Sequence, residues 1–262
     1  MRTNNVTTFP VLSDKSVIVT GGASGLGREA SILFAEAGAK VIVADYNLDG
    51  AEETVATIKQ AGGKAIAVRT DVSDSESVQN MVATAVETYG RLDGAFNNAA
   101  AAPDNALTSE FDEDYWDKLM KVDLKGVALC MKYEIKQFLA QGDGGAIVNT
   151  ASVSGIRPQP FNPAYVSAKH GVIGLTKVAA VENGPHNIRV NAIAPGAIDT
   201  PMLHDALEAL GTSGEEYAPM ISLLNRFGSP REIAQPALWL LSDAASYVTS
   251  TVIAVDAGYT GR

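Results

Sequence analysis

The stretch Ser16-Val-Ile-Val-Thr20-Gly21-Gly-Ala-Ser-Gly-Leu-Gly27 joins a β-branched run to a glycine-rich loop, and a helical pattern follows from Arg28 to Ala37. The sequence therefore predicts strand, loop and helix in immediate succession. Glycines let the backbone turn tightly and approach a phosphate, and the next helix supplies free N–H groups and a positive dipole end. The loop predicts a pyrophosphate site, although a tight strand-to-helix turn needs glycine in any case.

The glycine spacing differs from the commoner dinucleotide fingerprint, and the lysine of an ATP-binding P-loop is missing. A second buried run, Lys40 to Ala44, ends in Asp45. In nucleotide-binding βαβ units, an acid at this distance accepts hydrogen bonds from the adenine ribose and repels a 2′-phosphate. Neither Ser24 nor Tyr46 offers the cation that NADP needs, so NAD is the expected cofactor. The alternative is that Asp45 only caps its strand.

Strand and helix patterns alternate along the rest of the chain. This order predicts an α/β fold: a single Rossmann-type domain with a doubly wound parallel sheet of about seven strands and helices on both faces. The further expected strands are 65–69, 94–97, 146–150, 188–194 and 252–255, and the further helices are 48–61, 75–89, 112–139, 163–181 and 230–242. Residues 1–14 form a polar leader, and residues 199–227, which lack steady periodicity, suit a substrate lid.

Composition limits the classes of partner. The 262 residues carry a formal charge of −10, with no clustered Lys/Arg stripe, which argues against nucleic acid and anionic membranes. Cys130 is the only cysteine and lies in an apolar run, so we expect a buried small side chain and no disulfide or cysteine-built metal site. The N-terminus lacks the pattern of a secretion signal, and no run approaches membrane-spanning length. We expect a cytoplasmic protein without a metal.

Tyr165 and Lys169 stand one turn apart on the expected helix 163–181. A free tyrosine phenol has a pKa near 10 and is a poor base at neutral pH, but a close lysine cation favours the phenolate. An isolated pair of this spacing is more often a surface feature. Here Ser152 follows one expected strand, and Asp71-Val72 and Asn98-Ala99 follow two others, at the edge where open α/β sheets bind ligands.

With these residues placed, the chain resembles the single-domain branch of the short-chain dehydrogenase/reductase family from about Lys15 to Tyr259. The motifs that carry the resemblance are Thr20-Gly21-x-x-x-Gly25-x-Gly27, Asp45, Asp71-Val72, Asn97-Asn98-Ala99, Ser152, Tyr165-x-x-x-Lys169, and Pro195-Gly196 with Thr200. The resemblance implies catalytic roles for Ser152, Tyr165 and Lys169. It implies cofactor contacts from Gly21, Ser24, Gly25, Leu26, Gly27, Asp45, Asp71, Val72, Asn98, Ala99, Tyr165, Lys169, Pro195, Gly196, Ile198 and Thr200.

The sequence departs from the family pattern at Ala100, Ser250 and Ala257, where glycines are usual, and at Asp123. Asp123 stands where the family has an asparagine as its fourth catalytic residue, which helps to hold a water through its helix backbone. We assign it a catalytic role: within about 6 Å of Lys169 it would hold the lysine charged yet partly offset its pull on Tyr165. The alternative is a surface pair of Asp123 with a neighbouring lysine.

The resemblance implies hydride transfer between a nicotinamide and a carbinol carbon, with Tyr165 exchanging the hydroxyl proton, and it implies a homotetramer. Within the family, the narrower resemblance is to bacterial dehydrogenases of cyclic diols and secondary alcohols, and it lies in segments 92–100, 130–135 and 200–203. We expect an apolar, ring-bearing alcohol or ketone beside Val153, Phe161, Met202, Leu203 and Met220. Reduction of 3-oxoacyl carrier protein is an alternative that Asp45 disfavours. An idle NAD-binding sensor or scaffold is an alternative of another class.

Overall fold

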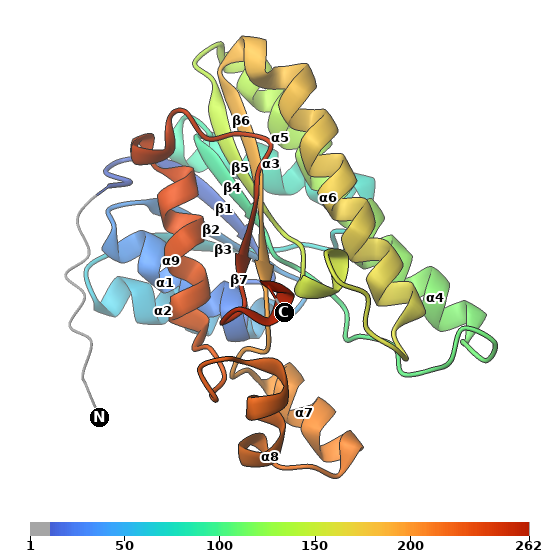
Figure 1. Ribbon diagram of the computed structural model, residues 1–262. Coiled ribbons are helices and arrows are strands. Elements are labelled where there is room, and N and C mark those ends of the chain that lie inside the picture. Colours follow the sequence, from blue (N-terminus) through green and yellow to red (C-terminus); the bar gives the residue numbers. More distant parts are fainter. Residues whose placement is uncertain (1–10, 262) are drawn as a thin grey trace.

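The computed structural model describes residues 11–261, apart from the side chains of residues 209 and 210, and contains a seven-stranded sheet (Figure 1). The strand order is β3-β2-β1-β4-β5-β6-β7, and all neighbouring strands are parallel. The strands are β1 Ser16–Thr20, β2 Lys40–Asp45, β3 Lys64–Arg69, β4 Gly94–Asn97, β5 Gly145–Thr150, β6 Ile188–Pro195 and β7 Val252–Val255. The order reverses between β1 and β4, and ligands of such sheets bind at that switch point.

Helices cover both faces of the sheet, which confirms the doubly wound fold (Figure 1). Those on one face are α1 Gly25–Glu36, α2 Leu48–Gln60 and α9 Pro230–Leu241, and those on the other are α3 Ser75–Tyr89, α5 Val127–Gln141 and α6 Pro163–Asn183. Strand residues alternate between two cores: Val17 and Val19 face the first, and Ile18 faces the second. Among the described residues, no helix is long and apolar enough to cross a membrane.

Three expected segments differ from the observed ones. Helix α1 begins at Gly25, so part of the predicted loop forms the first helical turn. The expected helix 112–139 is divided: α4 Glu113–Met120 continues through a π-helical turn, Lys121–Gly126, into α5. Residues 199–227 contain two short helices, α7 Pro201–Leu210 and α8 Gly214–Ile221, which project beyond the sheet (Figure 1).

The expected leader is only partly described, because residues 1–10 lie outside the described range. Within its last part, the Leu12 side chain is fully buried in the core beneath α1. Leu12 therefore belongs to the folded domain, although the sequence predicts a leader up to residue 14.

Ser250 and Ala257 adopt backbone conformations that glycine favours, with φ of 63° and 50°. L-residues enter this left-handed region at a steric cost of about 1 kcal/mol or more. The chain thus keeps the path for which glycine is suited while carrying a side chain at both positions.

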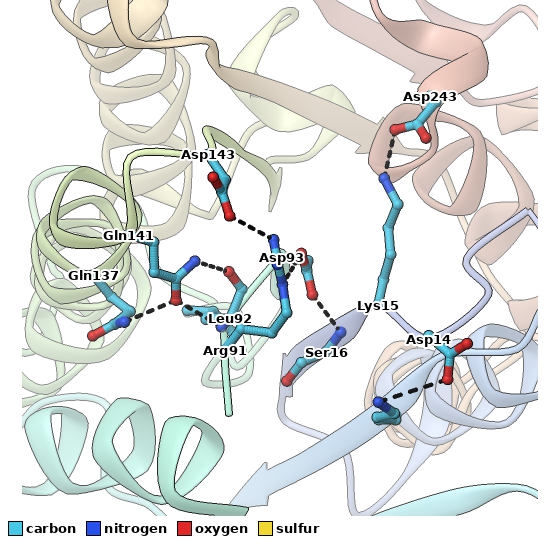
Figure 2. A network of polar contacts seen from close by, with 11 residues as sticks. Asp14, Lys15, Ser16, Arg91, Leu92, Asp93, Gln137, Gln141, Asp143 and Asp243 are labelled. Atoms are coloured by element: carbon cyan, nitrogen blue, oxygen red, sulfur yellow. Dashed lines mark hydrogen bonds and ion pairs between the residues drawn. The ribbon is translucent and has the colours of Figure 1, made fainter. Parts of the chain in front are cut away.

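The amino edge of the sheet is joined by polar contacts (Figure 2). Asp93 accepts hydrogen bonds from the backbone N–H of Ser16 at 2.8 Å and from Nε of Arg91 at 2.8 Å. The Gln141 amide accepts from the N–H of Leu92 at 2.9 Å and donates to its carbonyl at 2.7 Å. These bonds fix the starts of β1 and β4 to the end of α5. They lie opposite the carboxyl edge, where the predicted site residues gather.

Candidate functional site

The glycine-rich loop forms a cradle at the N-terminus of α1. Gly21 and Gly25 have φ of 70° and 51°, and a Cβ on Gly27 would meet the Gly21 carbonyl oxygen at 2.0 Å. Ser24 is the N-cap but makes no side-chain hydrogen bond to the helix, while Leu26 packs against the core. First-turn N–H groups without a side-chain cap, beside glycines that carry no Cβ atom, fit a phosphate group.

Asp45 ends β2 beside this cradle. Its Oδ2 accepts a hydrogen bond from the N–H of Ala23 at 2.9 Å, and its Oδ1 accepts one from Asn47 at 2.9 Å. A carboxylate has about four acceptor positions, so two bonds hold it in place and leave capacity for hydroxyl donors. The structure also adds a cation that we did not anticipate. Arg69 is the register partner of Asp45 on β3, and its guanidinium lies 4.8 Å from the centre of the Tyr46 ring.

The segments after β3 and β4 are held against the same edge. Asp71 accepts hydrogen bonds at its Oδ1 from both the N–H and the hydroxyl of Ser73, and Val72 is buried. Asn98 donates from Nδ2 to the Thr20 carbonyl, and the N–H of Ala99 donates to the Thr20 hydroxyl at 3.1 Å. Thr20 ends β1, so it fixes Asn98 and Ala99 directly beside the glycine loop.

The turn after β6 reaches the cradle from the other side. Pro195 ends the strand, and Gly196 approaches the Asp256 backbone so closely that a Cβ would lie 2.9 Å from its Cα. Ile198 forms a parallel bridge with Gly228. The Thr200 methyl lies 3.6 Å from the position that a Cβ on Gly25 would occupy. Thr200, at the end of this turn, therefore lies close to the glycine loop.

Ser152, Tyr165 and Lys169 come from the β5–α6 segment and from α6. Ser152 precedes a short 3₁₀ turn, Val153–Gly155, and its Oγ accepts a hydrogen bond from the N–H of Ser154 at 3.1 Å. A Cβ on Gly155 would lie 2.7 Å from the Lys169 carbonyl, so this turn packs directly on α6. The Lys169 ammonium donates to the Thr150 carbonyl at 3.2 Å and lies 5.3 Å from the centre of the Tyr165 ring.

Asp123 lies in the π-helical turn and is fully buried, so the alternative of an exposed surface pair is wrong. Its Oδ2 lies 3.2 Å from Nζ of Lys169, as an ion pair and not as an aligned hydrogen bond. Its Oδ1 accepts a hydrogen bond from the N–H of Ala101 at 2.7 Å. The condition set for this role, that Asp123 lies within about 6 Å of Lys169, is therefore met.

Burial and charge act in opposite directions on the pKa values of Asp123 and Lys169. Burial lowers the pKa of Lys169, but Asp123 and Tyr165 together raise it by more, and the pKa lies above its ordinary value. Burial raises the pKa of Asp123, and Lys169 and the Ala101 N–H counter only part of that rise. The lysine therefore stays protonated at neutral pH.

Sequence reasoning missed Asp104, which lies in the loop between β4 and α4. Its carboxylate accepts hydrogen bonds from the backbone N–H groups of Ala164 and Tyr165. The only local sign is an acidic residue after Pro103 in a loop, which does not predict a contact with a helix so far along the chain.

A cavity of about 430 Å³ lies between this loop, α4 and the start of α6. Its lining residues are Pro103, Asp104, Asn105, Ala106, Glu110, Phe111, Asp112, Tyr115, Trp116 and Ala164. Of the expected apolar pocket, Val153 is buried, whereas Phe161, Met202 and Met220 are exposed, and none of them lines this cavity. Within residues 11–261, no cluster of His, Cys, Asp or Glu could hold a metal ion.

Comparison with known proteins gives close relatives over nearly the whole chain. A family model described as enoyl-(acyl carrier protein) reductase matches residues 21–260. The chain is 50% identical to the short chain dehydrogenase/reductase astE of Aspergillus oryzae, over 94% of this chain and 95% of that one. It is 46% identical to a 2,5-dichloro-2,5-cyclohexadiene-1,4-diol dehydrogenase of Sphingobium indicum, over 95% and 98% of the two chains. The crystal structure of levodione reductase superposes with a TM-score of 0.91 at 39% identity, covering 95% of this chain and 98% of the other.

Proposed function

This chain belongs to the short-chain dehydrogenase/reductase family, and from that premise we propose that it transfers hydride between NAD and a secondary alcohol or its ketone. The observation that carries the proposal is the arrangement on α6. Tyr165 and the protonated Lys169 lie next to each other there, and the Ser152 segment packs on the same helix. In this proposal, the three residues supply acid/base, electrostatic and orienting groups at the carboxyl edge of the sheet.

In this proposal, Tyr165 takes the hydroxyl proton during oxidation and returns it during reduction. The Lys169 ammonium stabilises the phenolate, because an opposite charge at short range favours the ionised form. Ser152 orients the substrate oxygen and stabilises the negative charge that develops on it. NAD supplies the hydride acceptor when it is bound, and NADH the donor. Asp123 keeps Lys169 charged in a site that would otherwise disfavour the cation.

The residues around the glycine loop would hold the cofactor. The uncapped first turn of α1 fits the pyrophosphate, and the fixed carboxylate of Asp45 fits two ribose hydroxyls. Asp71, Val72, Asn98 and Ala99 would form the adenosine side, and Pro195, Gly196, Ile198 and Thr200 would contact the nicotinamide side. The same carboxylate at Asp45 supports NAD over NADP, since it would face a 2′-phosphate.

We propose a cyclic alcohol or ketone as the substrate. Support comes from the relatives named for a cyclohexadiene diol and for levodione, and from the apolar side chains that α7 and α8 expose, Met202 and Met220 among them. In this view residues 199–227 form a lid that covers the substrate, within a single domain. A homotetramer is also proposed, in which exposed Val178 and Val181 on α6 pack against a symmetry mate. The cytoplasmic location stays a prediction.

A substrate panel tests the proposal. Purified protein is mixed with NAD and cyclohexanol, a cyclic diol, an open-chain secondary alcohol or a short anionic hydroxy acid, and NADH formation is followed. We expect turnover with the ring alcohols. Preference for hydroxy acids would overturn the substrate class. NADH binding without turnover on any alcohol or ketone would favour the sensor or scaffold.

A further inference from the structure

Helix α6 begins without a capping side chain of its own. Asn162 occupies the N-cap and makes no side-chain hydrogen bond to the helix, and Pro163 has no N–H to donate. The next two backbone N–H groups, of Ala164 and Tyr165, each donate at 3.0 Å to one carboxylate oxygen of Asp104. A side chain from the β4–α4 loop therefore caps the helix that carries Tyr165.

The Asp104 side chain is well placed for this contact. Only 8% of the residue is exposed, so water competes weakly for its oxygens. A carboxylate at a helix N-terminus interacts favourably with the helix dipole, and hydrogen bonds to an ionised acceptor are stronger than neutral ones. Two further bonds fix the same junction: Asn162 Nδ2 donates to the Asp104 carbonyl, and the Ala106 N–H donates to the Phe161 carbonyl at 2.8 Å.

The same loop is tied to Lys169 through a second carboxylate. The N–H of Ala101 donates to Asp123 Oδ1, and the other oxygen of Asp123 pairs with Lys169. Both reactive groups of α6 are thus connected to the β4–α4 loop: Tyr165 through Asp104 at the helix N-terminus, and Lys169 through Asp123.

We propose that Asp104 is a positioning residue for the reaction, which fixes the first turn of α6 and so the direction from which the Tyr165 phenol enters the site. The inference rests on the proposed function of Tyr165. Both Asp104 oxygens are occupied by backbone N–H groups, so the residue acts through Tyr165 and does not itself exchange protons with substrate. A displacement of about 1 Å in a reacting group is enough to cost on the order of 100-fold in rate.

Two substitutions at Asp104 distinguish the loss of both backbone hydrogen bonds from the loss of one. Asp104→Ala removes both acceptors, and we expect kcat to fall about 10- to 100-fold while the Kd for NADH changes less than about 3-fold. Asp104→Asn keeps one acceptor oxygen, so kcat should fall by only about 3- to 10-fold, and this variant serves if the alanine protein folds poorly. The substrate KM should change less than kcat in both variants, because the lost interaction orients a group used in the transition state.

A matched control distinguishes positioning from a general loss of stability. Asp74 caps α3 through its Oδ2 and the N–H of Ser77 at 2.9 Å, and no proposed site residue lies on α3. Asp74→Ala should lower the melting temperature by an amount similar to Asp104→Ala and leave kcat at the parental value. An equal loss of kcat in the two alanine variants would overturn the inference.

The double variant provides the decisive readout. If Asp104 acts through the phenol, adding Asp104→Ala to Tyr165→Phe should change the residual rate by less than about 2-fold. The same fold-loss in both backgrounds contradicts the inference, as does a fully active Asp104→Ala beside an impaired Tyr165→Phe. If Tyr165→Phe keeps parental activity, the proposed role of Tyr165 fails, and the role of Asp104 fails with it.

Discussion

The ammonium of Lys169 lies 3.2 Å from the carboxylate of Asp123, and both side chains are excluded from solvent. Taking two charges out of water is costly, and it is offset only when the pair is close and has further hydrogen bonds. The Thr150 carbonyl accepts from the lysine, and the Ala101 N–H donates to the carboxylate. The pair is therefore one buried unit that joins the β4–α4 loop, the π-helical turn, β5 and α6.

Replacing Asp123 with Asn should keep turnover and move the rise of the oxidation rate to lower pH. The asparagine oxygen can still accept from the Ala101 N–H, so the turn keeps its shape. Without the neighbouring anion, the Tyr165 phenolate and the Thr150 carbonyl still favour the Lys169 cation, and the undiminished field of that cation favours the ionised phenol. A pH-rate profile checks the shift, and Asp117→Asn, at an exposed position of α4, is the control. Overlaid profiles would contradict the coupling, and a dead variant would show a more direct role.

Replacing Tyr165 with Phe should lower turnover by roughly 10² to 10⁴ while NADH still binds. The ring keeps its packing and loses only the group that exchanges the proton. Steady-state rates with a ring alcohol and NADH fluorescence measure the two effects. Tyr133→Phe is a control on α5, where the hydroxyl shares a hydrogen bond with Ser75. Parental turnover in the purified Tyr165 variant would place the acid/base chemistry elsewhere.

Most of the sheet could be predicted because buried parallel strands are short β-branched runs between glycine-rich or polar turns. The expected strand 94–97 and helix 75–89 coincide with β4 and α3. The π-helical turn at 121–126 could not be predicted, since its residues continue the helical pattern on both sides. The helices of 199–227 were missed because both are short and are separated by a turn at Gly211, and Pro219 lies inside α8.

For the candidate site, the spacing of residues within one helix was informative, whereas contacts between residues far apart in the sequence could not be predicted. Tyr165 and Lys169 are neighbours on one helix, so their spacing alone brings them together. Asp123 was singled out only as a departure from a family pattern. No local pattern singled out Asp104 or Arg69. Asp104 caps a helix from a separate loop, and Arg69 is the register partner of Asp45 on the neighbouring strand.

The NAD preference should depend on Asp45 and Arg69 together. A 2′-phosphate beside an ionised Asp45 should cost on the order of 2 to 4 kcal/mol, a preference of roughly thirty- to a thousand-fold for NAD. In Asp45→Asn the negative charge is gone, and Arg69 becomes the nearby cation on the adjacent strand. The preference should then fall at least about tenfold, and adding Arg69→Gln should weaken NADPH binding again. Kd values for NADH and NADPH decide this, and equal affinities in the parent would contradict the role of Asp45.

Glu134 is the buried acid that the proposed chemistry does not use. It lies on α5 with no exposed surface; its Oε2 accepts from Asn97 Nδ2 at 3.0 Å, and its Oε1 has no hydrogen-bond partner among the described residues. Burial raises its pKa to about 8, against an ordinary value of 4.5, and the single bond from Asn97 opposes the rise only in part. The acid is therefore protonated at neutral pH in the folded protein.

The free energy of unfolding should consequently fall as the pH rises from about 4.5 to about 8. In that window the folded state holds a proton that the unfolded chain has released, so raising the pH favours unfolding, by at most about 1.4 kcal/mol per pH unit. Glu134→Gln keeps an acceptor for Asn97 and cannot ionise, so its unfolding free energy should depend less on pH, and its advantage over the parent should grow between pH 5.5 and about 8.5. Urea unfolding at several pH values measures this difference. Glu52→Gln, at an exposed position of α2, should follow the parental pH dependence, and a Glu134→Gln curve parallel to the parent would show that this carboxyl does not titrate in that range.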